Sequence, residues 1–172
     1  MFLDVWKRKS IKRNIQKLID SNSGVQAATR IINVGIIVDF LDYKDLEALK
    51  KLASGLGKDI KCEIIYLVSD LKKEDELSRN KFDSTALTWQ GKVKNDDVSQ
   101  FIEKPFDLLI SYYRSENLIL QYITAKSSAL FKAGFPSETF QLNDLAINVN
   151  IEDNSAFEKE LNKYLKILNR IE

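Results

Sequence analysis

Histidine is absent from this chain of 172 residues, and cysteine occurs once, at Cys62. Without histidine, the sequence excludes His-ligated zinc sites and catalytic groups of the Ser-His-Asp or Cys-His type. A single cysteine excludes an internal disulfide, and its place inside an apolar run predicts a small buried side chain rather than a nucleophile. Carboxylate-only metal sites, lysine chemistry and paired carboxylates remain open.

Glycine and proline are also scarce, with 6 and 2 residues, while 44% of the residues are hydrophobic and 30% are charged. This composition is typical of a folded domain and excludes general disorder. No apolar run approaches the ~20 residues that span a bilayer. Asp4 and a basic segment follow Phe2 and Leu3 directly, without the apolar region of a signal peptide. We therefore expect a cytoplasmic protein without a transmembrane segment.

One apolar run, from Ile31 to Val38, gives the clearest indication of the fold. It is rich in β-branched residues and ends at Asp39, as expected for a strand buried on both faces of a parallel sheet. A helical pattern over 42–57 and a second apolar run over 60–68 complete a strand–helix–strand unit. The chain is therefore predicted to be α/β, with a basic amphipathic helix at 1–22. Residues 23–172 would form one three-layer, Rossmann-like sandwich around a mostly parallel sheet.

The remaining elements follow from shorter patterns. Strands are predicted at 85–89, 106–112, 128–135 and 145–151, and helices at 97–103, 115–126 and from a capping box at Ser155. Asp42 and Ser115 are the predicted caps of two helices, and residues 70–83 are predicted to be an exposed charged connection. Strand order cannot be predicted from these patterns.

Several of these segments resemble a known group of proteins. They are Phe106-Asp107-Leu108-Leu109-Ile110, the pair Tyr122-Ile123, and the run from Ser128 to Phe135. Together they are similar to an uncharacterised family of small bacterial α/β proteins, and the resemblance extends over the whole chain. It implies an α/β fold and no particular activity.

The carboxyl ends of the predicted strands form the first candidate site. Ligands of open α/β sheets bind at these ends, which here carry Asp39, Ser111, Tyr112, Arg114 and Ser115. A helix starting near Ser115 would offer backbone N–H groups to phosphate or carboxylate, and Arg114 would add its guanidinium. The alternative is an ordinary capped helix with two exposed tyrosines, because Glu116 also complements the helix dipole.

This edge carries no recognisable catalytic or cofactor motif. The Gly-x-Gly-x-x-Gly fingerprint and the Walker A motif are both missing, and Asp39 and Asp42 stand where a pyrophosphate would need close access to the backbone. Asp39, Asp42 and Asp45 have the oxygen chemistry of a Mg²⁺ or Ca²⁺ site, but capping a helix is the commoner role of such residues. We therefore predict no metal, no cofactor and no catalytic residue.

The first helix provides the second candidate site. At helical spacing, Phe2, Trp6, Lys9, Arg13 and Lys17 share one face, and Ile11, Ile15 and Leu18 share the opposite face. Residues 1–20 also contain six of the 26 basic residues and only two of the 25 acidic ones.

Two functional hypotheses follow. The leading one is a non-catalytic adaptor that docks this basic, aromatic face on anionic lipid, RNA phosphate or an acidic protein patch. In the alternative, this helix is simply a basic surface element with its aromatic residues folded onto the domain. The competing functional hypothesis is a Rossmann-like enzyme or sensor that binds a small anion at the strand ends.

Overall fold

The computed structural model describes residues 2–21, 30–69, 71 and 80–171, and the side chains of its first helix from Asp4 onward. The six strands are β1 (Asn33–Asp39), β2 (Lys61–Leu67), β3 (Lys81–Phe82), β4 (Leu108–Tyr112), β5 (Lys132–Gly134) and β6 (Leu145–Ala146). The helices are α1 (Phe2–Ser21), α2 (Leu46–Ser54), α3 (Asp96–Glu103), α4 (Leu118–Lys126) and α5 (Asn154–Ile167), and Ser84–Ala86 form one turn of 3-10 helix.

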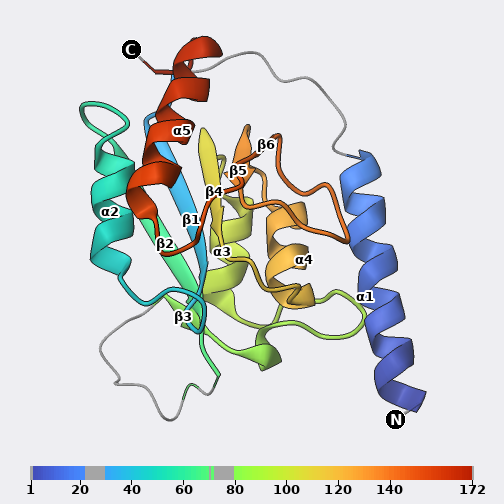
Figure 1. The fold of residues 1–172 in the computed structure, drawn as a ribbon. Helices are drawn as coiled ribbons and strands as arrows, with labels where there is room; N and C mark the ends of the chain where they lie inside the picture. The colour runs from blue at the N-terminus through green and yellow to red at the C-terminus, as the bar shows by residue number, and fades with distance from the viewer. Residues whose placement is uncertain (1, 22–29, 70, 72–79, 172) are drawn as a thin grey trace.

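The strands form one sheet in the order β3-β2-β1-β4-β5-β6, and every neighbouring pair is parallel. This is the strand order of a doubly wound fold, in which the chain runs outward from the middle of the sheet in both directions. The prediction of a Rossmann-like α/β sandwich is confirmed. β1 lies at the centre because its apolar residues can be covered from both sides (Figure 1).

Alternate residues of β1 enter two separate cores. Val34, Ile36 and Val38 pack with α2 and α5 on one face of the sheet. Ile37 packs with α3 and α4 on the other face. Gly35 also faces this second layer, where an added Cβ would lie 2.7 Å from the ring of Phe106. The helices thus form the two outer layers of a three-layer sandwich, as predicted.

Helix α1 lies against the outer side of α4 rather than on the sheet itself (Figure 1). Ile15 is fully buried, and it packs with Tyr122 and Ala125 of α4 and with Leu142 of the loop before β6. Asn14 adds a hydrogen bond from its side-chain amide to the carbonyl of Gln90, at 3.3 Å. Among the described helices, none combines the length and the apolar character needed to cross a bilayer.

Several predicted boundaries are wrong. The strand predicted at 85–89 is instead the 3-10 turn followed by an isolated bridge between Leu87 and Val93. The strands predicted at 128–135 and 145–151 shorten to β5 and β6, although Ile147 to Asn150 keep the predicted alternation of inward and outward side chains. Strand β3 was missed because two residues are too few to produce a pattern.

The caps of three helices also differ from the prediction. Asp45 caps α2 in place of Asp42, Asn117 caps α4 in place of Ser115, and Asp153 caps α5 in place of Ser155. In the first two cases the displaced residue has another partner, since Asp42 and Ser115 take part in contacts between the segments at the carboxyl ends of β1 and β4. These contacts define the first candidate site.

Candidate functional site

The carboxyl ends of β1 and β4 meet where the chain reverses its direction of winding, which is the usual ligand site of such sheets. We call this place the rim and define it by Asp39, Asp42, Arg114 and Ser115. Asp39 ends β1, and only 4% of its surface is exposed. Its carboxylate accepts a 2.7 Å hydrogen bond from the Ser115 hydroxyl and a 3.1 Å bond from the backbone N–H of Leu41. The Asp39 carboxylate is therefore buried and already hydrogen-bonded to other groups of the protein.

Asp42 satisfies the backbone donors that an anionic ligand would need. One of its carboxylate oxygens, Oδ2, accepts hydrogen bonds from the N–H groups of Arg114 and Ser115, both at 3.0 Å. Consecutive N–H groups of this kind form the anion-binding feature of many α/β proteins. Here the protein supplies its own anion, so a phosphate would have to displace a tethered carboxylate and approach a second one at Asp39.

The Arg114 side chain is directed toward the loop that follows β6. Its guanidinium donates to the carbonyl of Val149 at 3.3 Å and to the side-chain oxygen of Asn148 at 3.4 Å. The guanidinium carbon also lies 5.7 Å from the centre of the Phe135 ring, within the range of a cation–π contact. These contacts give Arg114 a role in holding the 148–149 loop at the rim.

Tyr112 and Ser111 lie beneath the rim rather than at its surface. Tyr112 has no exposed surface, and its hydroxyl donates a 2.8 Å hydrogen bond to the carbonyl of Ile151. Burial raises the pKa of Tyr112 above its ordinary value. Ser111 is buried beside the Thr124 hydroxyl, which also contacts the hydroxyl of the buried Tyr113 at 2.7 Å. The expectation of two exposed tyrosines is therefore wrong.

Glu116 has a role that the sequence did not reveal. Its carboxylate accepts from the Ser137 hydroxyl at 3.0 Å, the Glu138 N–H at 2.9 Å and the Gln121 amide at 2.5 Å. Burial alone would raise the pKa of Glu116, but hydrogen bonds from Thr139, Glu138 and their neighbours lower it below its ordinary value. Glu116 thus joins the loop after β5 to the segment that leads into α4, next to the rim.

The outward face of α1 has the opposite character, because its described side chains are exposed. Trp6 is 72% exposed and Val5 is 62% exposed. Lys9, Arg13 and Lys17 are exposed on the same side of the helix, and none of them forms an ion pair within the described part of the chain. We call this surface, defined by Trp6, Lys9, Arg13 and Lys17, the α1 face. The side chain of Phe2, which the sequence adds to it, lies outside the described residues.

The charge of the α1 face is reinforced by its neighbours. Lys7, Arg8 and Lys12 are also exposed on α1, and among the described side chains of the helix only Asp4 and Asp20 are acidic. Positive charge therefore continues along the helix from Lys7 to Lys17, with large apolar side chains at its amino-terminal end. This distribution makes the outward side of α1 a basic surface with exposed apolar groups at one end.

Comparison with known proteins places the chain in a family. A family model matches residues 7–168, from the first half of α1 to just beyond α5. The chain belongs to this family of unknown function, DUF6913. No curated protein and no solved structure matches the chain significantly. The family match includes Lys9, Arg13 and Lys17 of the α1 face and all of the rim.

Proposed function

We propose that this protein is a non-catalytic adaptor that docks on an anionic lipid bilayer through the α1 face. The observation that carries the proposal is the 72% exposure of Trp6 on a helix whose other face is buried against α4. Trp6 and its neighbour Val5 are both exposed on this helix, and exposed apolar side chains that lie together mark interaction sites. Tryptophan is also enriched in membrane proteins at the level of the lipid headgroups.

The basic residues favour a lipid surface over an apolar protein groove. Each exposed Lys or Arg near an anionic membrane contributes about 1 kcal/mol to the free energy of binding. The apolar methylene groups of these side chains can be buried in the headgroup region while the charged ends stay in water. Trp6 and Val5 would enter the boundary between headgroups and acyl chains while Lys9, Arg13 and Lys17 meet lipid phosphates. Binding of this strength is reversible, as suits a peripheral adaptor.

The hydrogen bonds that already occupy the polar groups of the rim support the non-catalytic part of the proposal. Asp42 already accepts from the two N–H groups that would hold an anionic substrate, and Arg114 is bonded to the loop after β6. The cytoplasm is the proposed location, because the inner leaflet of a cell membrane carries anionic lipids and a reducing compartment suits the unpaired Cys62. The rest of the surface would then be available to a second partner.

Sedimentation with lipid vesicles tests the proposal. We expect the protein to bind vesicles that contain phosphatidylglycerol and not vesicles of phosphatidylcholine alone. Replacing Lys9, Arg13 and Lys17 together with Gln should weaken binding about 100-fold, since three contributions of about 1 kcal/mol are lost. The matched control replaces Lys58, Lys159 and Lys166, which are exposed elsewhere, with Gln. It changes the net charge equally and should leave binding nearly unchanged.

Three results would contradict the proposal. Equal weakening by both triple variants would show that only the total charge matters. Absence of binding to the anionic vesicles at low salt would exclude a lipid partner. Tight binding of RNA or of an acidic protein by the same face, without vesicle binding, would assign the α1 face to that partner instead.

A further inference from the structure

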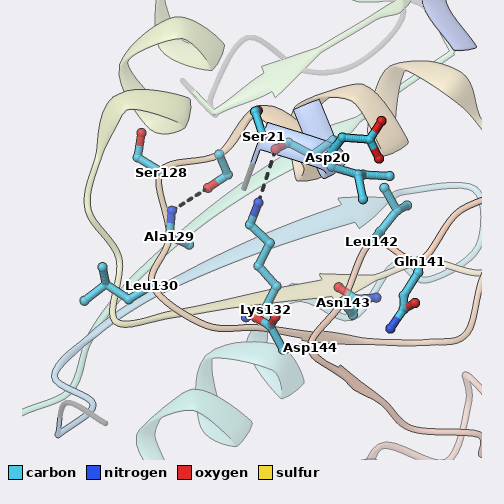
Figure 2. Close-up of a pocket in the computed structure, with 13 residues that line it drawn as sticks. Asp20, Ser21, Ser128, Ala129, Leu130, Lys132, Gln141, Leu142, Asn143 and Asp144 are labelled. Carbon is cyan, nitrogen blue, oxygen red and sulfur yellow. Dashed lines mark hydrogen bonds between the residues drawn. The ribbon is translucent and has the colours of Figure 1, made fainter. Parts of the chain in front are cut away.

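A cavity of about 620 Å³ lies at the end of the sheet opposite the rim. It is bounded by the carboxyl-terminal ends of α1 and α4, by the start of β5 and by the loop that leads to β6. Its wall is mainly polar and includes Asp20, Ser127, Ser128, Gln141, Asn143 and Asp144. Lys132, the first residue of β5, also lines it (Figure 2). The volume is sufficient for a small molecule.

The amino group of Lys132 is poorly solvated for a charged group. The residue is only 9% exposed, and its Nζ donates a single hydrogen bond among the described residues, to the carbonyl of Ala125 at 3.2 Å. An ammonium has three N–H donors, whereas a neutral amine needs fewer acceptors and carries a lone pair. One oxygen of the Asp144 carboxylate accepts from the backbone N–H of Lys132 at 2.8 Å, and no ion pair joins the two side chains.

These surroundings increase the share of the neutral amine. Burial lowers the pKa of Lys132 to about 8, although the negative charge of Asp144 raises it in part. Asp20, at the end of α1, is the other charged group on the cavity wall besides Lys132 and Asp144. A pKa of about 8 leaves a fraction of the amine neutral near physiological pH, and a neutral amine that faces a cavity can act as a nucleophile.

We propose that Lys132 is a nucleophile and that the cavity binds a small, uncharged hydroxyaldehyde as an imine. The lone pair of Nζ attacks the carbonyl carbon, and the C–N bond forms while the carbonyl π bond breaks. The carbonyl oxygen then leaves as water with both amine protons, and Nζ is joined to the former carbonyl carbon by a double bond. No oxidant, reductant or further reactant is needed, and the step is independent of the docking proposed for α1.

The wall of the cavity selects the class of ligand. Asp20, Asp144 and the carboxyl-terminal ends of two helices make the cavity negative, which disfavours keto acids and sugar phosphates. The Ser127 and Ser128 hydroxyls and the Gln141 amide are suited to a ligand with hydroxyl groups.

Selective labelling of the wild-type protein tests the proposal. The protein is incubated with glycolaldehyde and cyanoborohydride at pH 7.5, and the modified lysines are identified by peptide mass spectrometry. We expect Lys132 to react at least tenfold faster than the exposed Lys58, and its rate should level off above about pH 8 while that of Lys58 continues to rise. Lys132→Arg, which keeps the positive charge, should leave the labelling of Lys58 unchanged.

Three other results would contradict the proposal. If labelling follows solvent exposure, Lys132 will be among the last lysines to react, and the proposal is overturned. If the preference for Lys132 survives unfolding in urea, the cavity has no part in it, and the proposal is again overturned. Faster labelling by glyoxylate, an aldehyde with a carboxylate, than by glycolaldehyde would exclude the proposed uncharged ligand.

Discussion

Replacing Phe157 with Ala is expected to lower the free energy of unfolding by about 3–5 kcal/mol, the usual range for deleting a buried aromatic ring. Phe157, in the first turn of α5, has no exposed surface. Its ring centre lies 5.1 Å from that of Tyr112 in an edge-to-face arrangement, and 5.0 Å from that of Phe135. The substitution would leave a cavity directly beneath the rim. Urea unfolding followed by circular dichroism measures the loss.

Ile167→Ala is the control for this substitution. Ile167 belongs to the same helix but is 66% exposed, so its truncation should change the stability by no more than about 0.5 kcal/mol. A loss below about 1 kcal/mol for Phe157→Ala would contradict the packing described here, because a buried ring cannot be removed so easily from a close-packed core.

Asp42→Ala is expected to lower the stability by about 2–3 kcal/mol, because it leaves the N–H groups of Arg114 and Ser115 without their acceptor. Asp42→Asn keeps a side-chain oxygen at this position and should lose about half as much. We also expect this variant to gain the ability to bind a small anion. With the carboxylate removed, millimolar pyrophosphate should raise the melting temperature of the Ala variant, since the two N–H groups become available to an anion.

The wild-type protein is the reference in this experiment, and it should show no comparable response to pyrophosphate. If wild type is stabilised as much as Asp42→Ala, the rim is open to anions as it stands. The hypothesis of a small-anion enzyme or sensor would then regain support over the adaptor. If Asp42→Ala has the stability of wild type, the two hydrogen bonds from Arg114 and Ser115 contribute nothing, and the rim is not held closed by Asp42.

The central layers of the fold were predictable from the sequence because they depend on long, strong patterns. The β-branched run that became β1 is buried on both faces, and the stripe of Phe157, Leu161 and Leu165 on α5 packs on the sheet as its spacing indicates. Shorter elements were harder to place. A strand of two or three residues, such as β3 or β5, exists because a neighbouring strand pairs with it, and that neighbour is distant in the sequence.

The location of the rim was predictable from the sequence, but the hydrogen bonds that occupy its polar groups were not. Asp39 and Ser115 were expected at the same edge of the sheet because both lie at the carboxyl ends of strands, and the Ser115 hydroxyl lies 2.7 Å from the Asp39 carboxylate. The closure of the rim depends on contacts that no local pattern contains. Tyr112 bonds to Ile151, 39 residues away, and Asp42 bonds to Ser115, 73 residues away. A strand buried on both faces also gives no alternation that would distinguish an inward tyrosine from an outward one.

The surroundings of Lys132 were even harder to predict from the sequence. In the sequence it is a lysine inside an apolar run, where a charged residue usually indicates the end of a strand. Only the folded chain brings it between the ends of α1 and α4 and the loop before β6. The α1 face, by contrast, is a property of one helix, and the spacing of Trp6, Lys9, Arg13 and Lys17 predicts from the sequence that they share one side of it.

Trp6 fluorescence is the most direct measurement of whether the α1 face enters a membrane. In a Trp89→Phe background Trp6 is the sole tryptophan of the chain, so its emission reports on the α1 face alone. We predict that emission shifts to shorter wavelength with phosphatidylglycerol vesicles, is quenched by brominated acyl chains, and returns near 1 M salt, where the Debye length is about 3 Å. Unchanged emission while the protein sediments with these vesicles would contradict the account, because another surface would then bind the lipid.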